Sequence, residues 1–259
     1  MKLHMETAGH GPALVLLHGW GLHSGIWSTL LPKLVQHYRV SCIDLPGHGH
    51  SPAPADAFDL EAAATAIAAH APPGAAWLGW SLGGQLALAA ALAGHDISRL
   101  VLVATTPRFV TAADWPCGVA PATLTGFAAS LAADHRKTVR DFLSLQVRGD
   151  RHAASLLRKL RAALKERGDP APGALRGGLE ILAATDLRER LGALPQPTLV
   201  IAGERDRLTP AMAGQRLAAS LPDGRCLVLP GAAHAPFLAQ PAAFLAAVTG
   251  FLPGREAAA

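Results

Sequence analysis

Ser81 lies at the centre of a motif that could supply a nucleophile. The sequence Gly79-Trp80-Ser81-Leu82-Gly83 has the pattern G-x-S-x-G, with a strand-like run before it and a helix-like run after it. A sharp turn between two such elements strains the serine, and glycines are needed two residues before and after it because side chains there would clash. The motif predicts a nucleophilic serine. The alternative is a Gly/Ser turn that only caps a helix.

A serine hydroxyl needs a base to take its proton and a carboxylate to orient that base. Among 12 histidines, His234 follows the last strand-like run and precedes the final helix-like segment. This position suits the base when the chain order is nucleophile, acid, histidine. Asp206 fits the acid because it follows the strand-like run at residues 198–202, and Glu204 and Asp186 are its competitors. The alternatives are a surface-loop histidine and a turn-forming aspartate.

Backbone N–H groups near Ser81 could hold a negatively charged oxygen. Leu82 begins the helix after the serine, where free N–H groups and the helix dipole favour negative charge. The motif Leu17-His18-Gly19-Trp20-Gly21 ends the first core strand, and a loop there supplies a second donor, for which we select Trp20. We expect His18 to brace this loop by hydrogen bonding. No His, Asp or Glu cluster has metal-site spacing, and the predicted chemistry needs neither metal nor organic cofactor.

Short apolar runs bounded by Gly, Pro or Asp predict the strands that position these residues. They span residues 13–17, 40–45, 76–78, 100–104, 198–202 and 226–229. Helical patterns alternate with several of them, which predicts an α/β fold with a mostly parallel central sheet and helices on both faces. Sites in such sheets form at the carboxyl ends of the strands, where Ser81, Asp206 and His234 all fall.

The strand pattern stops between about residues 111 and 190, and helical periodicity replaces it. We therefore predict a first core part at 1–110, an inserted helical lid at 111–190 and a second core part at 191–259. Two apolar helix faces in this region support the prediction of a helical lid. They consist of Val139, Phe142 and Leu143, and of Leu156, Leu157, Leu160 and Leu164.

The composition excludes several classes of protein. Half of the residues are apolar and 16% are charged, which is typical of compact folded proteins and not of disordered ones. The longest apolar stretch is far too short to cross a bilayer, and residues 1–12 lack the apolar centre of a secretory signal. We expect a cytoplasmic, monomeric protein that inserts in no membrane. We find no nucleic-acid recognition motif and expect no nucleic-acid partner.

Positive charge is concentrated in the predicted lid. Residues 136–167 contain 10 Lys or Arg and three acidic residues, within a chain of net charge +4. Helical spacing predicts that Arg151, Arg158, Arg161 and Lys165 share one face of the second lid helix, while Lys137 and Arg140 pair on the first. An acidic partner would suit this surface. The alternative is an ordinary solvated helix face.

Taken together, the motifs resemble those of the pimeloyl-[acyl-carrier protein] methyl ester esterases of biotin biosynthesis, a family with the α/β-hydrolase fold. The matching segments are Leu16–Leu22, Asp44–Gly49, Trp77–Gly84, Gly177–Leu182 and Ala232–Phe237. The resemblance implies hydrolysis of a methyl ester at the far end of a pimeloyl chain carried on acyl-carrier protein. The products would be pimeloyl-[acyl-carrier protein] and methanol.

The resemblance also implies roles for particular residues. Trp20, Leu82 and Phe142 would contact the acyl chain. Basic lid residues would contact the carrier, and Lys137 and Arg158 match two such positions. The full set of expected carrier contacts is Lys137, Arg140, Arg151, Arg158 and Arg161. In contrast, Asp141 and Ala154 stand where the family pattern favours basic residues.

Other functions remain compatible with these residues. A broad short-chain carboxylesterase, a lactonase or a proline iminopeptidase-like enzyme would share the predicted serine, acid and histidine. A ligand-binding protein could also use the same scaffold with little turnover, since a fold does not determine a function.

Overall fold

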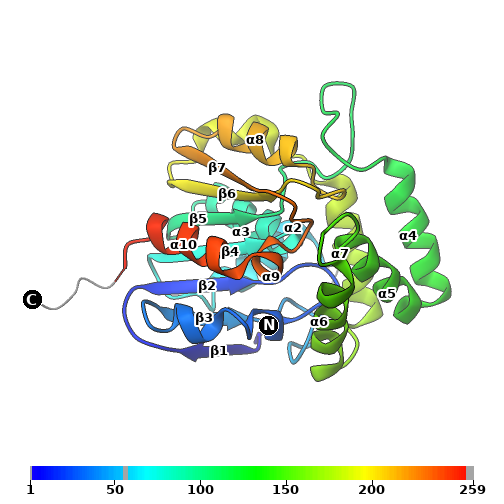
Figure 1. Ribbon diagram of the computed structural model, residues 1–259, viewed down its shortest axis with the longest axis horizontal. Coiled ribbons are helices and arrows are strands. Elements are labelled where there is room, and N and C mark those ends of the chain that lie inside the picture. The colour runs from blue at the N-terminus through cyan, green and yellow to red at the C-terminus, as the bar shows by residue number, and fades with distance from the viewer. Residues whose placement is uncertain (1, 55–57, 255–259) are drawn as a thin grey trace, which may run out of the picture.

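A seven-stranded sheet forms the centre of the molecule, with strand order β1-β3-β2-β4-β5-β6-β7 (Figure 1). The structure is a computed structural model that describes residues 2–54 and 58–254. The first residue of the predicted range 1–110, its residues 55–57 and the last five residues of the predicted range 191–259 lie outside the described residues. The strands are β1 (Met5–Ala8), β2 (Ala13–Leu17), β3 (Arg39–Ile43), β4 (Ala75–Trp80), β5 (Ile97–Val103), β6 (Thr198–Gly203) and β7 (Gly224–Leu229).

The sheet confirms the predicted parallel core. Strands β2 to β7 pair in parallel, and each of the six predicted runs corresponds to one of them. Strand β1 was not predicted. It pairs antiparallel with β3 at the sheet edge, and all four of its residues are exposed. An exposed edge strand held by main-chain hydrogen bonds has no apolar run that would reveal it in a sequence.

Helices cover both faces of the sheet. Figure 1 shows α9 and α10 in front of the strands and α3 behind them. Helix α3 is buried along most of its length, which explains why its sequence is apolar on every side. The helices outside the β5–β6 connection are η1 (Ser24–Trp27), α1 (Leu31–Leu34), α2 (Leu60–Ala68), α3 (Leu82–Leu92), α8 (Ala211–Ala219), α9 (Pro236–Ala239) and α10 (Pro241–Phe251).

The connection between β5 and β6 contains a helical segment, which we define as α4 (Pro121–Ala133), α5 (His135–Gln146), α6 (Ala153–Glu166) and α7 (Pro172–Ala184). A short η2 (Arg188–Ala193) follows it. Figure 1 shows these four helices gathered at the end of the sheet toward which β2 runs. The division of the chain into core and lid stays a prediction.

The predicted apolar faces in this segment are inward-facing. Val139, Phe142 and Leu143 are buried on α5. On α6, Leu156, Leu160 and Leu164 are buried, and Leu157 is half-buried. These faces pack the two helices against the rest of the molecule.

The prediction that Arg151 shares a face of α6 is wrong. Helix α6 begins at Ala153, so Arg151 lies in the turn before it. The Asp150 carboxylate accepts hydrogen bonds from the N–H groups of His152 and Ala233. These bonds hold the turn, and helical spacing cannot reveal a turn that depends on a residue 83 positions away. The Arg151 guanidinium lies against Gly231 instead.

In the described part of the chain, no helix combines the length and the apolar composition needed to cross a membrane.

The junction of β4 and α3 is a very tight turn. Ser81 stands between the two elements with φ 54° and ψ −117°, a strained conformation for a residue with a side chain. A Cβ at Gly79 would press on the backbone of Gly83 and lie 2.7 Å from the Gly84 Cα. A Cβ at Gly83 would lie 2.6 Å from the Leu17 carbonyl oxygen. The predicted need for glycine on both sides of Ser81 is confirmed.

We predict that Gly83→Ala destabilises the protein, because the new methyl group meets backbone atoms that cannot rotate away. The free energy of unfolding should fall by about 1–3 kcal/mol. Gly126→Ala is the matched control, since Gly126 lies within α4 and nothing stands within 4 Å of its added Cβ. That change should raise the free energy of unfolding by about 0.5–1 kcal/mol. Urea denaturation measures both, and equal effects would contradict the close packing of α3 on β2.

Candidate active site

Three side chains from different parts of the chain form one hydrogen-bonded row. The Ser81 Oγ lies 2.9 Å from the His234 Nε2, and the His234 Nδ1 lies 2.7 Å from the Asp206 Oδ2. Ser81 follows β4, Asp206 follows β6 and His234 follows β7, so all three come from the carboxyl ends of parallel strands. The structure thus brings together the three residues that the sequence selected.

The hydrogen bonds set the direction of proton transfer along this row. An ionised carboxylate can only accept, so the His234 Nδ1 carries the hydrogen and donates it to Asp206. The Nε2 of a neutral ring is then without a hydrogen and can accept from the Ser81 hydroxyl. Ser81 and His234 are both 1% exposed, so little water competes for these bonds. The arrangement can take a proton from an alcohol and stabilise the resulting imidazolium.

Asp206 has more hydrogen-bond partners than the histidine predicted from the sequence. Its Oδ1 accepts hydrogen bonds from the N–H groups of Leu208 and Thr209, and its Oδ2 accepts one from the Thr209 hydroxyl at 2.6 Å. Thr209 was missed, although a threonine three residues after an aspartate is a recurrent turn pattern that could have identified it. Both oxygens of the carboxylate are therefore held by hydrogen bonds besides the one from His234.

The competing carboxylates have other partners. Glu204 accepts a hydrogen bond from the Gly231 N–H. Asp186 forms ion pairs with Arg108 and Arg188, and their hydrogen bonds hold its pKa well below the usual range. Asp206 is the carboxylate that hydrogen-bonds to His234.

The loop carrying His234 is held by groups that the sequence analysis did not identify. The Trp80 indole N–H donates to the His234 carbonyl oxygen at 2.7 Å. The His234 N–H donates to the carbonyl oxygen of Gln146, the last residue of α5, at 3.0 Å. Next to it, the Ala233 N–H donates to Asp150. The turn between α5 and α6 therefore contacts the histidine loop directly.

The three predicted acyl-chain contacts are buried. Trp20, Leu82 and Phe142 are completely buried, and the Trp20 and Phe142 rings are 4.8 Å apart in an edge-on arrangement. The Trp20 indole N–H donates to the Leu175 carbonyl oxygen in α7. The predicted acyl-chain contacts thus lie together at the boundary between the sheet and the helical segment. Ser81 itself is 1% exposed.

Beside this cluster, an apolar cavity of about 260 Å³ lies between α4 and α7. Leu124 and Leu179 are among the residues that line it, and Arg176 and Glu180 add charge. Ser81 does not line this cavity.

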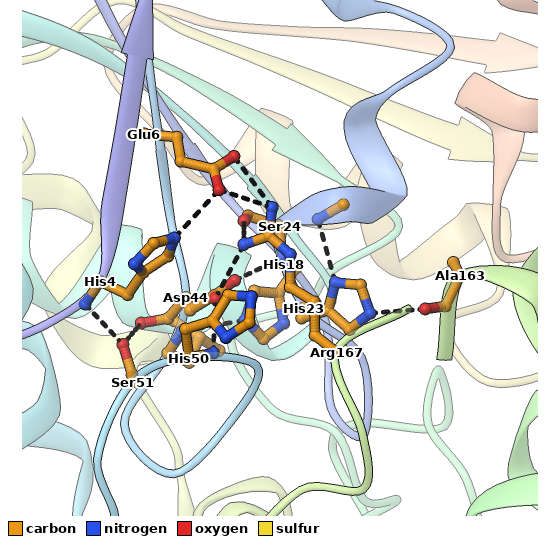
Figure 2. A network of polar contacts seen from close by, with 12 residues as sticks. His4, Glu6, His18, His23, Ser24, Asp44, His50, Ser51, Ala163 and Arg167 are labelled. Carbon is orange, nitrogen blue, oxygen red and sulfur yellow. Dashed lines mark hydrogen bonds and ion pairs between the residues drawn. The ribbon is translucent and has the colours of Figure 1, made fainter. Parts of the chain in front are cut away.

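A polar network surrounds the buried Asp44 carboxylate and includes residues of the loop after β2 (Figure 2). The Asp44 carboxylate accepts from the Ser24 N–H, the His50 N–H and the Arg167 guanidinium. Burial opposes its ionisation, but the nearby His18 imidazole and the backbone N–H groups of His50 and Ser24 outweigh burial and hold its pKa below the usual range. His18 hydrogen-bonds to Gly19 and Leu45 in the same region, as expected of a bracing residue.

The predicted carrier contacts are exposed. Lys137 and Arg140 lie on α5, and Arg158 and Arg161 on α6. Lys137 pairs with Asp141 at 2.6 Å, so the acidic residue that departs from the family pattern partly neutralises it. Within residues 2–54 and 58–254, no group of three or more His, Cys, Asp or Glu side chains could hold a metal ion.

Comparisons with known proteins agree with this geometry. A family model described as alpha/beta hydrolase fold matches residues 12–241. A pimeloyl-[acyl-carrier protein] methyl ester esterase from Xanthomonas campestris pv. campestris (strain B100) is 47% identical over 236 residues, covering 91% of this chain and 93% of that relative. One from Stenotrophomonas maltophilia (strain R551-3) is 44% identical over 252 residues, covering 97% of both chains.

Among solved structures, an esterase from Exiguobacterium antarcticum matches with a TM-score of 0.88 at 22% identity. The match covers 96% of this chain and 94% of that one. At this identity the likeness establishes the fold alone.

We predict that Asp206→Asn lowers the kcat of ester hydrolysis by about ten-thousand-fold, because an amide no longer selects the required imidazole tautomer. Glu204→Gln is the control, since Glu204 lies on the same loop but does not contact His234. Its kcat should stay close to that of the unaltered enzyme. Steady-state kinetics on a soluble ester measures both, and a larger loss in Glu204→Gln would reverse the assignment of the acid.

Proposed function

The chain belongs to the family of pimeloyl-[acyl-carrier protein] methyl ester esterases on the α/β-hydrolase fold, and we propose that it uses Ser81 to hydrolyse the methyl ester of pimeloyl-[acyl-carrier protein]. The protein is a carboxylic ester hydrolase. One observation carries the proposed mechanism: the Ser81 hydroxyl, the His234 imidazole and the Asp206 carboxylate form a continuous hydrogen-bonded row. The products are pimeloyl-[acyl-carrier protein] and methanol.

The first half of the reaction forms an acyl-enzyme. His234 takes the hydroxyl proton as the Ser81 Oγ attacks the ester carbonyl carbon. The N–H groups of Leu82 and Trp20 stabilise the oxygen that becomes negative. The bond to the methoxy group then breaks, and His234 gives its proton to that oxygen, so methanol leaves. Asp206 stabilises the imidazolium throughout and stays ionised.

The second half releases the acid. Water enters where methanol left and gives a proton to His234 as it attacks the acyl carbon. The bond to the Ser81 Oγ breaks, and His234 returns the proton to that oxygen. The balance is one ester and one water consumed, one acid and one methanol formed. No group outside the chain is needed to carry electrons or protons.

Within this proposal the helical segment acts as a lid. The serine is 1% exposed, so an acyl chain held by a protein cannot reach it unless the structure opens. Helix α7 packs directly on Trp20, since a Cβ at Gly178 would lie 2.6 Å from that indole. The apolar cavity between α4 and α7 lies on the other side of this helix. Movement of α7 would therefore expose apolar surface suited to a hydrocarbon chain.

We also propose that the carrier docks on the exposed basic residues of this segment, in particular Lys137 and Arg158. Acyl-carrier proteins present acidic helices, which complementary charge would attract. The site is complete within one chain, so a monomer is sufficient for the chemistry. We place the enzyme in the cytoplasm, without nucleic acid or membrane as partner.

We predict that Ser81→Ala lowers kcat on pimeloyl-[acyl-carrier protein] methyl ester by about a million-fold while the protein stays folded. The reason is that the Ser81 hydroxyl is the group that hydrogen-bonds to the His234 Nε2. Methanol release measures the rate, and thermal melting checks the fold. A fluorophosphonate should label Ser81 in the unaltered enzyme. Near-normal turnover by Ser81→Ala would disprove the mechanism, and absence of both labelling and turnover in the unaltered enzyme would favour a ligand-binding protein.

We predict that Lys137→Glu combined with Arg158→Glu lowers kcat/KM for the carrier-bound ester by about tenfold or more, because charge attraction accelerates the encounter. Activity on a short soluble ester should change little. Arg39→Glu combined with Arg225→Glu is the matched control, since both are exposed residues near the amino ends of strands, far from the helical segment. Equal losses on the two substrates, or equal losses in control and test proteins, would contradict carrier docking on α5 and α6.

A further inference from the structure

The His18 imidazole makes two hydrogen bonds that together determine its protonation. Its Nε2 lies 2.9 Å from the Leu45 N–H, and its Nδ1 lies 2.9 Å from the Gly19 carbonyl oxygen. A backbone N–H can only donate, so Nε2 is the acceptor and carries no hydrogen. A carbonyl oxygen can only accept, so Nδ1 carries the hydrogen. The surroundings therefore select one neutral tautomer of a completely buried ring.

The carbonyl group that receives this hydrogen belongs to the same peptide unit as the Trp20 N–H. No peptide bond in the described ranges is cis, and in a planar trans peptide the C=O and N–H point in opposite directions. The bond from His18 to the Gly19 oxygen therefore turns the Trp20 N–H away from the imidazole. This peptide unit lies beside the nucleophile, because a Cβ at Gly19 would be 3.3 Å from the Ser81 Cβ.

We propose that His18 is a positioning residue, whose Nδ1–H aims the Trp20 N–H at the oxygen that becomes negative during catalysis. This inference rests on the proposed function, in which the Trp20 N–H is an oxyanion donor. It gives His18 a task beyond bracing a loop. The hydrogen bond to the Gly19 oxygen also polarises the peptide unit, which makes the Trp20 N–H a stronger donor.

Neighbouring groups keep the ring in this state. Burial lowers the pKa of His18 to about 3, so the ring is neutral at any pH at which the esterase would operate. A second neutral imidazole, His48, accepts from the Gly21 N–H and donates to the Pro46 carbonyl oxygen, and burial lowers its pKa to about 4. The Asp44 carboxylate holds the far end of the same loop through the Ser24 N–H (Figure 2). The loop that follows the peptide oriented by His18 is thus held at Gly21 and at Ser24.

Two substitutions distinguish a His18 that orients the Trp20 N–H from a His18 that only braces the loop. His18→Asn places an amide nitrogen close to the position of Nδ1, where it can still donate to the Gly19 oxygen. His18→Gln places its side-chain amide group close to the position of Nε2, where the amide oxygen can accept from the Leu45 N–H. This variant leaves the Gly19 oxygen without its donor. Both remove the ring to a similar degree. If His18 only braces the loop, the two variants should lose activity together.

We expect His18→Gln to lower kcat on a soluble nitrophenyl ester by about a hundredfold with little change in KM, because the oxyanion donor is no longer aimed. His18→Asn should keep most of kcat. His48→Gln can likewise keep the bond accepted from the Gly21 N–H and loses the bond donated to the Pro46 carbonyl oxygen. It should reduce the melting temperature but lower kcat less than His18→Gln. Equal kcat losses in the two His18 variants, or a greater loss in His18→Asn, would overturn the inference.

Two further measurements keep the outcome decisive. Ser81→Ala is assayed in parallel: if it stays active, the proposed function itself fails, whereas an inactive Ser81→Ala with equal His18 variants overturns the positioning role alone. If the His18 variants do not fold, nitrogen NMR of the unaltered enzyme decides. Between pH 5 and 9 the His18 ring should carry hydrogen on Nδ1 and none on Nε2. The opposite tautomer, or a doubly protonated ring, would overturn the inference.

Discussion

The turn at Ser81 is the constraint on which the rest of the site depends. Strand β4 and helix α3 meet with a single residue between them, which forces that residue to a positive φ and requires glycine at positions 79 and 83. The absence of side chains there lets α3 lie against β2, and β2 leads directly into the loop that carries Trp20. The strained turn thus places the hydroxyl, the helix N-terminus and the neighbouring loop within one small volume. Strain of about 1–3 kcal/mol at such a residue persists because the surrounding sheet holds it.

The sequence was sufficient to predict the sheet core and the three principal residues. Each of those residues follows an apolar strand run, and the order of the parallel strands brings their carboxyl ends together. What it could not reveal were contacts between backbone groups and residues distant in the chain. Asp150 and Gln146 hold the histidine loop through main-chain atoms, and Arg151 falls outside α6 because Asp150 caps a turn. Thr209 is different, since its spacing from Asp206 was visible and was overlooked.

Several polar contacts attach the helical segment to the core, and two of them involve carboxylates. One is the turn between α5 and α6, which contacts the histidine loop. The other is Arg167, which follows α6 and bonds to the buried Asp44 and to Glu6 in β1 (Figure 2). Asp44 has no exposed side-chain surface, so removing Arg167 would leave a buried carboxylate without its cation, at a cost of about 3–5 kcal/mol. Helix α7, in contrast, meets Trp20 mainly through apolar contacts and the single bond to the Leu175 carbonyl oxygen.

The hydrogen bond from the His234 N–H to the Gln146 carbonyl oxygen connects the position of the catalytic base to the position of the turn after α5. If the turn after α5 withdraws, the imidazole loses a support at the same moment that the serine becomes accessible to solvent. Bulk water would then reach a His234 imidazole that is poorly aligned with Ser81. The same contact would therefore link the enclosure of the site to the alignment of its base.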